Sequence, residues 1–144
     1  MGRVIRTETG ARDRRQLLQG LGAALARAAD PKCSTEEQGD ILAFSAMSLR
    51  EINQAVEKTA AAWEGRGYWL KADKFRREWA WAAQIGSALD GSLRGADLGR
   101  AALAAARMAP HLSSVQVPAR LARSLPWRGA LQRFQELTAL RPVP

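Results

Sequence analysis

Hydrophobic residues recur three or four positions apart along nearly the whole chain, and the strict alternation typical of strands is almost absent. Only residues 4–5 and 115–117 favour β structure, and both stretches are short. The pattern therefore predicts an all-α protein with four main helices plus a C-terminal helix, over residues 11–29, 34–65, 68–90, 97–108 and 127–140. Because long helices joined by short loops pack against their neighbours, we expect an up-and-down helical bundle. A single helical domain would span residues 1–144, with residues 1–10 and 141–144 extended or frayed.

The second helix has the clearest predicted start. Ser34 is followed three residues later by Glu37, which is the pattern of a capping box. Glu36, Glu37 and Asp40 place negative charge near the helix N-terminus, where the helix dipole favours it. A helix of this length would span about 45 Å and form the spine of the bundle.

The third helix is predicted to carry most of the aromatic residues. Its apolar stripe includes Phe75 and Trp79, and Trp81 lies about 200° from Trp79 around the helix. If Trp79 faces the core, Trp81 points outward, on a face that also carries Lys74 and Arg77. An Arg77–Trp81 cation–π contact on that face would contribute about 0.5–1 kcal/mol.

The density of aromatic residues has three interpretations. Four of the five Trp residues and the only Tyr fall within residues 63–81. Another segment could cover Trp81 and complete a second layer of core. Trp69 and Trp81 could instead anchor a protein or self-association interface, because Trp is enriched among interface hot spots. An indole beside cations could also stack on a nucleic-acid base.

The charge is unevenly distributed. The chain holds 22 Lys or Arg against 14 Asp or Glu, a net charge of +8. Residues 1–15 carry +3 and residues 116–144 carry +4, whereas residues 16–115 carry only +1. Basic terminal segments are common in nucleic-acid-binding proteins, and Arg suits phosphate because its planar fork bonds two oxygens at once. The candidate polyanion-binding residues are Arg3, Arg6, Arg12, Arg14, Arg15, Lys74, Arg77, Arg120, Arg123, Arg128 and Arg133.

The arginine content does not by itself require a nucleic-acid partner. A genome rich in G and C encodes many Ala, Arg and Gly residues, and the chain holds 28 Ala, 18 Arg and 12 Gly. The arginines would then be solvated surface. An acidic protein is also a candidate partner, because it would present carboxylates to the same side chains.

Catalytic and metal-binding patterns are scarce. Zinc sites need several thiolates or imidazoles, whereas the chain has one Cys, Cys33, and one His, His111. The position of Cys33 before a helix N-terminus could lower the pKa of its thiol, but its only possible histidine partner is far away in sequence, so we interpret it as a free thiol without a mechanistic role. Arg107 and His111 flank Pro110, which interrupts the helix that would carry them as a catalytic pair. We therefore expect no enzyme activity, metal, cofactor or small-molecule substrate.

The location is predicted from what the chain lacks. No stretch approaches the about 18 apolar residues of a transmembrane helix, and residues 1–8 are not followed by the apolar core of a secretory signal. We expect a cytoplasmic protein without a membrane partner. The sequence predicts a non-catalytic basic binding or accessory module that engages RNA, DNA or another polyanion within a larger assembly. The alternative is a homo-oligomeric or protein-interaction scaffold that uses residues 63–81.

Overall fold

A computed structural model of the protein describes residues 7–140, which form eight α-helices and no strand. The helices are α1 (Thr7–Ala28), α2 (Thr35–Gly65), α3 (Trp69–Glu78), α4 (Ala80–Arg94), α5 (Leu98–Ala106), α6 (Ala109–Leu112), α7 (Ala119–Ser124) and α8 (Ala130–Leu140). The all-α prediction is confirmed. The chain divides into more and shorter helices than the predicted bundle of four main helices plus a C-terminal helix, and the up-and-down arrangement is not confirmed.

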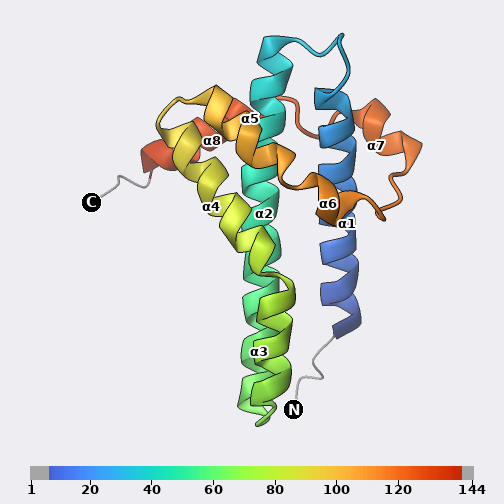
Figure 1. Ribbon diagram of the computed structural model, residues 1–144, viewed down its shortest axis with the longest axis vertical. Coiled ribbons are helices and arrows are strands. Elements are labelled where there is room, and N and C mark those ends of the chain that lie inside the picture. Colours follow the sequence, from blue (N-terminus) through green and yellow to red (C-terminus); the bar gives the residue numbers. More distant parts are fainter. Residues whose placement is uncertain (1–6, 141–144) are drawn as a thin grey trace.

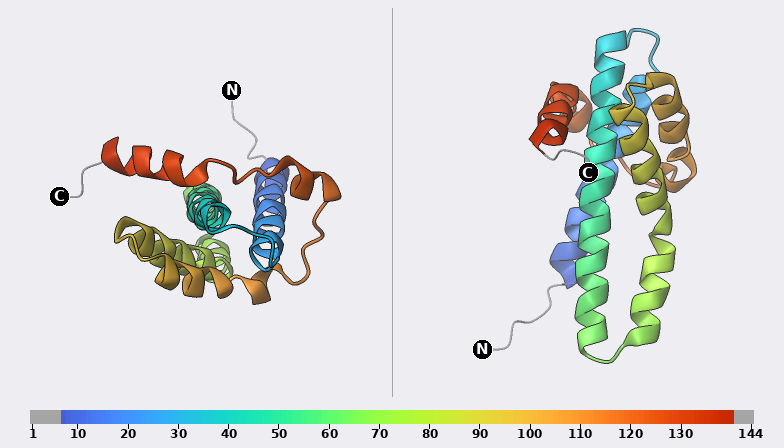
Figure 2. Two further views of the ribbon diagram at one scale, coloured as in Figure 1. Left: turned by 90° about the horizontal axis from the view of Figure 1, so that it is seen from above. Right: turned by 90° about the vertical axis from the view of Figure 1, so that its left-hand side faces the viewer.

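The longest helix, α2, is the centre of the molecule. α1 and α3 run antiparallel to it, while α8 lies on the opposite side of α2 from α4 and α5 (Figures 1 and 2). α2 contacts each of these five helices. It can be covered on several sides because small residues allow close approach: Ala43, Ala46 and Ser45 are all buried. The Ser45 hydroxyl donates to the Ile41 carbonyl oxygen at 2.8 Å, so no polar group is left unpaired there.

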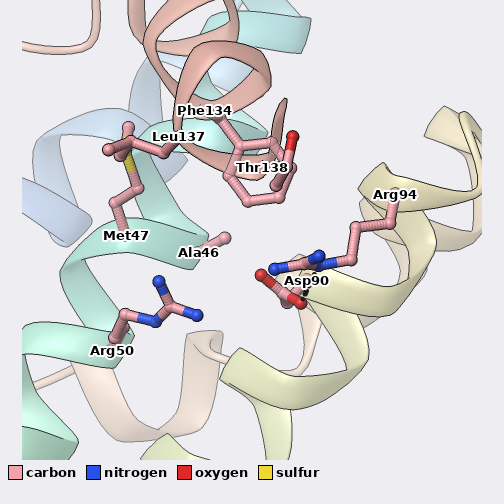
Figure 3. Close-up of a pocket in the computed structure, with 8 residues that line it drawn as sticks. All are labelled: Ala46, Met47, Arg50, Asp90, Arg94, Phe134, Leu137 and Thr138. Carbon is pink, nitrogen blue, oxygen red and sulfur yellow. Dashed lines mark hydrogen bonds and ion pairs between the residues drawn. The ribbon is translucent and has the colours of Figure 1, made fainter. Parts of the chain in front are cut away.

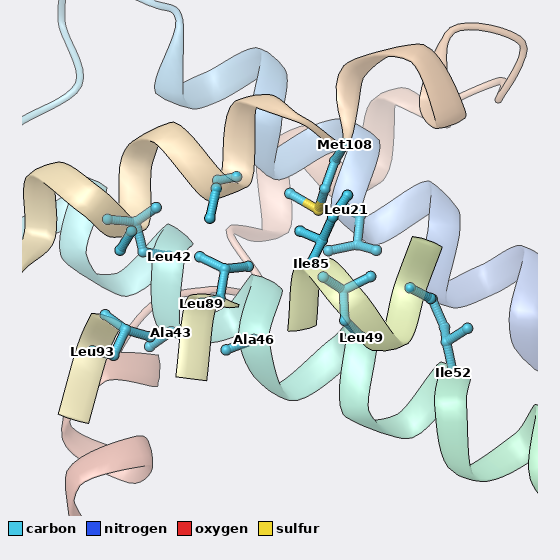
Figure 4. Packing of buried hydrophobic residues seen from close by; sticks show 14 of the residues in the cluster. Leu21, Leu42, Ala43, Ala46, Leu49, Ile52, Ile85, Leu89, Leu93 and Met108 are labelled. Carbon is cyan, nitrogen blue, oxygen red and sulfur yellow. The ribbon is translucent and has the colours of Figure 1, made fainter. Parts of the chain in front are cut away.

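The main core lies between α1, α2, α4 and the end of α5. Leu21, Leu49, Ile85, Leu89 and Met108 are buried together in it (Figure 4). Burying a side chain of this size contributes about 1.5–3 kcal/mol relative to leaving it exposed. This cluster positions the α2–α4 pair, while α6 and α7 pack on α1.

The ends of the first two helices agree only partly with the prediction. α1 begins at Thr7, so residues 7–10 are helical and the prediction that they are extended is wrong. α2 begins as predicted, and the Ser34 hydroxyl oxygen accepts a hydrogen bond from the Glu37 amide at 3.0 Å. The reciprocal half of the capping box is replaced, because the Glu37 carboxylate binds Arg27 and Trp127.

The predicted continuous third helix is wrong. α3 ends at Glu78 and α4 starts at Ala80, and between them Trp79 has φ −106° and ψ 6°. The break lets α4 turn away from the axis of α3 (Figure 1). It also brings the rings of Trp79 and Trp81 to 5.9 Å, with 28° between their planes. Side chains two residues apart in an unbroken helix would point in nearly opposite directions.

The C-terminal third is also more divided than expected. The fourth helix is shorter than predicted, with Asp97 capping α5 and Pro110 in the first turn of α6, where proline is tolerated. Residues 113–126 contain α7 in place of the expected loop. The last helix starts at Ala130 rather than 127, because Gly129 has φ +76°. Leu137 is 47% exposed, although its spacing predicts an inward side chain.

Candidate polyanion interface

The C-terminal third contains a long segment without acidic residues. Residues 98–135 hold six arginines and no Asp or Glu. Four of these arginines lie on α7 and around the turn that leads to α8, and we call them the α7–α8 arginines: Arg120, Arg123, Arg128 and Arg133. All four are exposed.

Apolar side chains of the same segment fix its inward side. Leu121 and Leu125 pack against a small cluster formed by α1, the α1–α2 loop, α2 and Trp127. Trp127 is only 1% exposed and is the largest fully buried side chain. Its ring packs edge to face on Phe44 at 6.3 Å, and its Nε1 donates to Glu37 Oε2 at 3.0 Å. The fold therefore places the apolar residues inward and leaves the intervening arginines outward.

The turn before α8 brings two of the arginines together. Leu125 has φ +49° and Gly129 has φ +76°, so two residues of this turn adopt the left-handed conformation that glycine favours. The two Asp40 carboxylate oxygens accept hydrogen bonds from the Gly129 and Leu131 amides, at 3.1 and 3.0 Å. Arg133 Nη1 donates to the Arg128 carbonyl oxygen at 3.1 Å, which folds its guanidinium back over the turn.

The α7–α8 arginines differ in their partners from four arginines of the helical body. Within residues 7–140, none of the four forms an ion pair with a carboxylate. Four arginines of the helical body do: Arg27 with Asp30 and Glu37, Arg76 with Glu57 and Glu64, Arg77 with Asp73, and Arg94 with Asp90. Other body arginines, such as Arg50, Arg66, Arg100 and Arg107, form no ion pair among the described side chains. Hydrogen bonds in these pairs raise the pKa of Arg27 and Arg76 and lower the pKa of Glu37 and Glu64.

The N-terminal candidates do not form one group. Arg3 and Arg6 lie outside the described residues. Arg12 and Arg15 are exposed near the start of α1. The Arg14 guanidinium instead lies over the rings of Phe75 and Trp79, 4.9 and 5.6 Å from their centroids, and burial lowers its pKa. Arg14 is therefore a packing residue between α1 and α3.

The two candidates on α3 also differ from each other. Lys74 is exposed. Arg77 forms an ion pair with Asp73, four residues earlier in α3, at 3.3 Å between Nη2 and Oδ2. The expected Arg77–Trp81 cation–π contact is not found among the contacts of the described residues, because the helix break moves Trp81 to another face.

Trp81 does not point outward, and of the three interpretations the structure supports the one in which another segment, here α6, covers it. The Trp81 side chain is half-buried. His111 from α6 stacks on it at 4.2 Å with only 3° between the ring planes, and Trp79 lies at 5.9 Å. Trp69, the other predicted interface residue, is 64% exposed. Sequence reasoning did not anticipate that the neighbours of Trp69, Tyr68 and Leu70, would be exposed with it.

Cys33 lies in the loop before the Ser34 cap, as predicted. Its side chain is buried beside Trp127, and burial raises the pKa of its thiol, with the Glu37 carboxylate acting in the same direction. The expectation that helix amides lower this pKa is wrong. Glu37 and Asp40, interpreted as caps, in fact hold the C-terminal segment, a role that only the tertiary structure reveals.

The hollows on the surface differ in chemistry. A small cavity of about 20 Å³ lies between α2, α4 and α8, where the Asp90–Arg94 pair faces Arg50 and Phe134 (Figure 3). This volume is close to that of a single water. A larger groove of about 530 Å³ between α1, α2 and α5 is lined by uncharged residues, most of them apolar. Within residues 7–140, no three His, Cys, Asp or Glu side chains cluster as metal ligands.

No described helix is both long and apolar enough to cross a bilayer. Comparisons with protein families, with curated proteins and with solved structures find no match to this chain. The α7–α8 arginines are therefore assessed on their geometry and charge alone.

Proposed function

We propose that the protein is a non-catalytic binding module in which the α7–α8 arginines hold the phosphate backbone of RNA or DNA. The observation that carries this proposal is four exposed guanidinium groups, free of carboxylate partners within residues 7–140, on a segment anchored by Trp127, Glu37 and Asp40. The proposed setting is the cytoplasm, within a larger assembly.

Counterion release would drive such binding. Each phosphate that an arginine neutralises releases condensed cations, so affinity falls steeply as salt rises. Phosphate contacts position a protein on nucleic acid without reading its sequence. The two neighbours of Trp81 occupy its ring, so we do not assign it to base stacking. We accordingly expect binding with little base preference.

The test compares two variants with the same change in net charge. In the first, Arg120, Arg123, Arg128 and Arg133 are replaced by Gln. In the matched control, four other exposed cations are replaced by Gln: Lys58, Arg66, Arg100 and Arg107. Binding of labelled duplex DNA and RNA is followed by fluorescence anisotropy over a range of salt concentrations.

The first variant should lose most of its affinity at low salt, and its salt dependence should flatten by about 0.9 per arginine that contacts a phosphate. The control should retain the wild-type salt dependence. Equal losses in both variants would mean that the net charge alone attracts nucleic acid. No binding by the wild type at low salt would refute the proposal and favour an acidic protein as the partner.

A second candidate function is self-association or protein binding through the aromatic segment. The specific observation in its favour is the exposed Trp69. Trp81 no longer supports it, because His111 stacks on this half-buried side chain. Sedimentation velocity of the wild type and of Trp69→Ala tests this candidate, which requires an oligomer that the substitution dissociates.

A further inference from the structure

We propose that the turn between α2 and α3 contacts the surface of an anionic lipid bilayer through three consecutive side chains. Tyr68, Trp69 and Leu70 are 55%, 64% and 87% exposed. They lie at one end of the molecule, away from α7 (Figure 1). We call these three residues the apolar tip. The proposal is independent of the nucleic-acid function, and it replaces the expectation of no membrane partner with a peripheral contact.

The turn that carries the apolar tip is held by backbone hydrogen bonds. The Tyr68 amide donates to the Trp63 carbonyl oxygen and the Gly67 amide to the Glu64 carbonyl oxygen, both at 2.9 Å. Gly67 has φ +83°. Together these features form a Schellman motif, which closes the end of α2. Trp63 packs edge to face on Phe75 at 5.0 Å and fills the inside of the hairpin. The exposure of the tip is therefore fixed by the fold, and binding would require little further ordering.

The charge around the apolar tip is positive. Arg66, Lys71 and Lys74 are exposed, and none of them has a carboxylate partner within the described part of the chain. The nearby carboxylates are ion-paired: Glu57 and Glu64 with Arg76, and Asp73 with Arg77. The Lys71 ammonium lies over the Trp63 ring, 4.7 Å from its centroid. An apolar projection beside cations that lack carboxylate partners is complementary to a bilayer surface that carries negative headgroups.

The shape and size of the apolar tip favour a bilayer over a protein partner. Trp and Tyr are enriched at membrane–water interfaces, where an apolar ring and a polar group both find suitable surroundings. The three side chains expose on the order of 400 Å², about half of the roughly 800 Å² that each partner buries in a standard protein interface. The tip protrudes and offers no groove for a peptide. It can enter the headgroup region of a bilayer without a matching surface.

The test uses the full chain and vesicles of phosphatidylcholine with or without phosphatidylglycerol. Leu70→Glu is compared with Leu103→Glu, a control in which a 73% exposed leucine on α5 is changed in the same way. Leu70→Glu should weaken co-sedimentation with anionic vesicles by about tenfold or more. Leu103→Glu should bind as the wild type does. Replacing Arg66 and Lys74 by Gln should weaken binding about 25-fold, since each cation near an anionic surface contributes about a fivefold factor.

A spectroscopic measurement separates insertion from adsorption. Anionic vesicles should shift the tryptophan emission of the wild type to shorter wavelength, and Trp69→Phe should abolish that shift while circular dichroism remains unchanged. Vesicle binding that depends on the α7–α8 arginines and not on Leu70 would overturn the proposal. So would an absence of binding, or an oligomer in sedimentation velocity that Leu70→Glu dissociates.

Discussion

The arginines of α3 and α4 and the α7–α8 arginines are the same residue type in different electrostatic surroundings. Arg76 is held by Glu57 and Glu64 from α2, and Arg94 by Asp90 one turn earlier in α4. The α7–α8 arginines lie in a segment without an acidic residue. The charge of the first group is therefore used within the molecule, whereas the charge of the second is presented to solvent. Whether an arginine can bind an external anion therefore depends on the carboxylates within its reach more than on the total number of arginines.

The two regions also differ in how they are fixed. α3 is tied to α2 by the packing of Trp63 on Phe75 and by ion pairs at the surface, which usually contribute little to stability. The α7–α8 segment is tied down by a buried indole and by hydrogen bonds to Glu37 and Asp40. The position of the α7–α8 segment should therefore depend on a few interior contacts. These contacts do not involve the outward arginine side chains.

The largest expected effect comes from removing the buried indole. Trp127→Ala should lower the free energy of unfolding by about 3–5 kcal/mol, because it leaves a cavity and removes a donor to Glu37. Chemical denaturation measures this loss. Hydrogen exchange should show residues 118–135 opening before α3 and α4. The control Trp69→Ala, at an exposed site, should change stability by less than about 0.5 kcal/mol. Similar small effects of both substitutions would show that Trp127 does not anchor the segment.

A second effect is loss of stability in acid. Hydrogen bonds from Arg27 and Trp127 lower the pKa of Glu37, and the hydrogen bond from Arg76 lowers the pKa of Glu64. A carboxyl whose pKa is lower in the folded state stabilises the fold above its unfolded pKa, about 4.3 for Glu. That contribution disappears as the pH falls through the lower folded value.

Stability should therefore decrease below about pH 4.3. Glu37→Gln and Glu64→Gln should each make this decrease less steep, which thermal melts at several pH values can follow. Glu136→Gln is the control, because Glu136 forms no ion pair within the described residues. A decrease of unchanged steepness in both test variants would show that these ion pairs are not coupled to folding.

The sequence predicts the features that depend on local spacing. The Ser34 cap, the length of α2 and the Asp73–Arg77 pair all follow from residues within a few positions of each other. The acid-free stretch of residues 98–135 is equally visible in the chain itself. These observations are enough to predict an all-α protein with a basic C-terminal region.

Features that depend on long-range contacts could not be predicted. The break at Trp79 places two indoles against Arg14 and His111, which are distant in sequence. Likewise, nothing near Glu37 indicates that its carboxylate binds Trp127, 90 residues away. Helical periodicity pointed Trp81 outward, and the charge of residues 1–15 made Arg14 a candidate anion ligand. Neither pattern contains information on the distant residues that pack against these side chains.

The smallest effect is expected when one ion-paired arginine, Arg76, and one of the α7–α8 arginines, Arg123, are each replaced by Gln. Arg76→Gln removes the partner of two carboxylates, so Glu57 and Glu64 are left to repel each other near the end of α2. Arg123→Gln removes an exposed side chain without a carboxylate partner in the described part of the chain, and it should change the free energy of unfolding by less than about 0.5 kcal/mol. The melting temperature should fall more for Arg76→Gln, and added salt should reduce the difference because it screens the pair. For nucleic-acid affinity the order should reverse, with Arg123→Gln the weaker binder. If Arg76→Gln lowered both the melting temperature and the nucleic-acid affinity more than Arg123→Gln does, the distinction between ion-paired and outward arginines would be wrong.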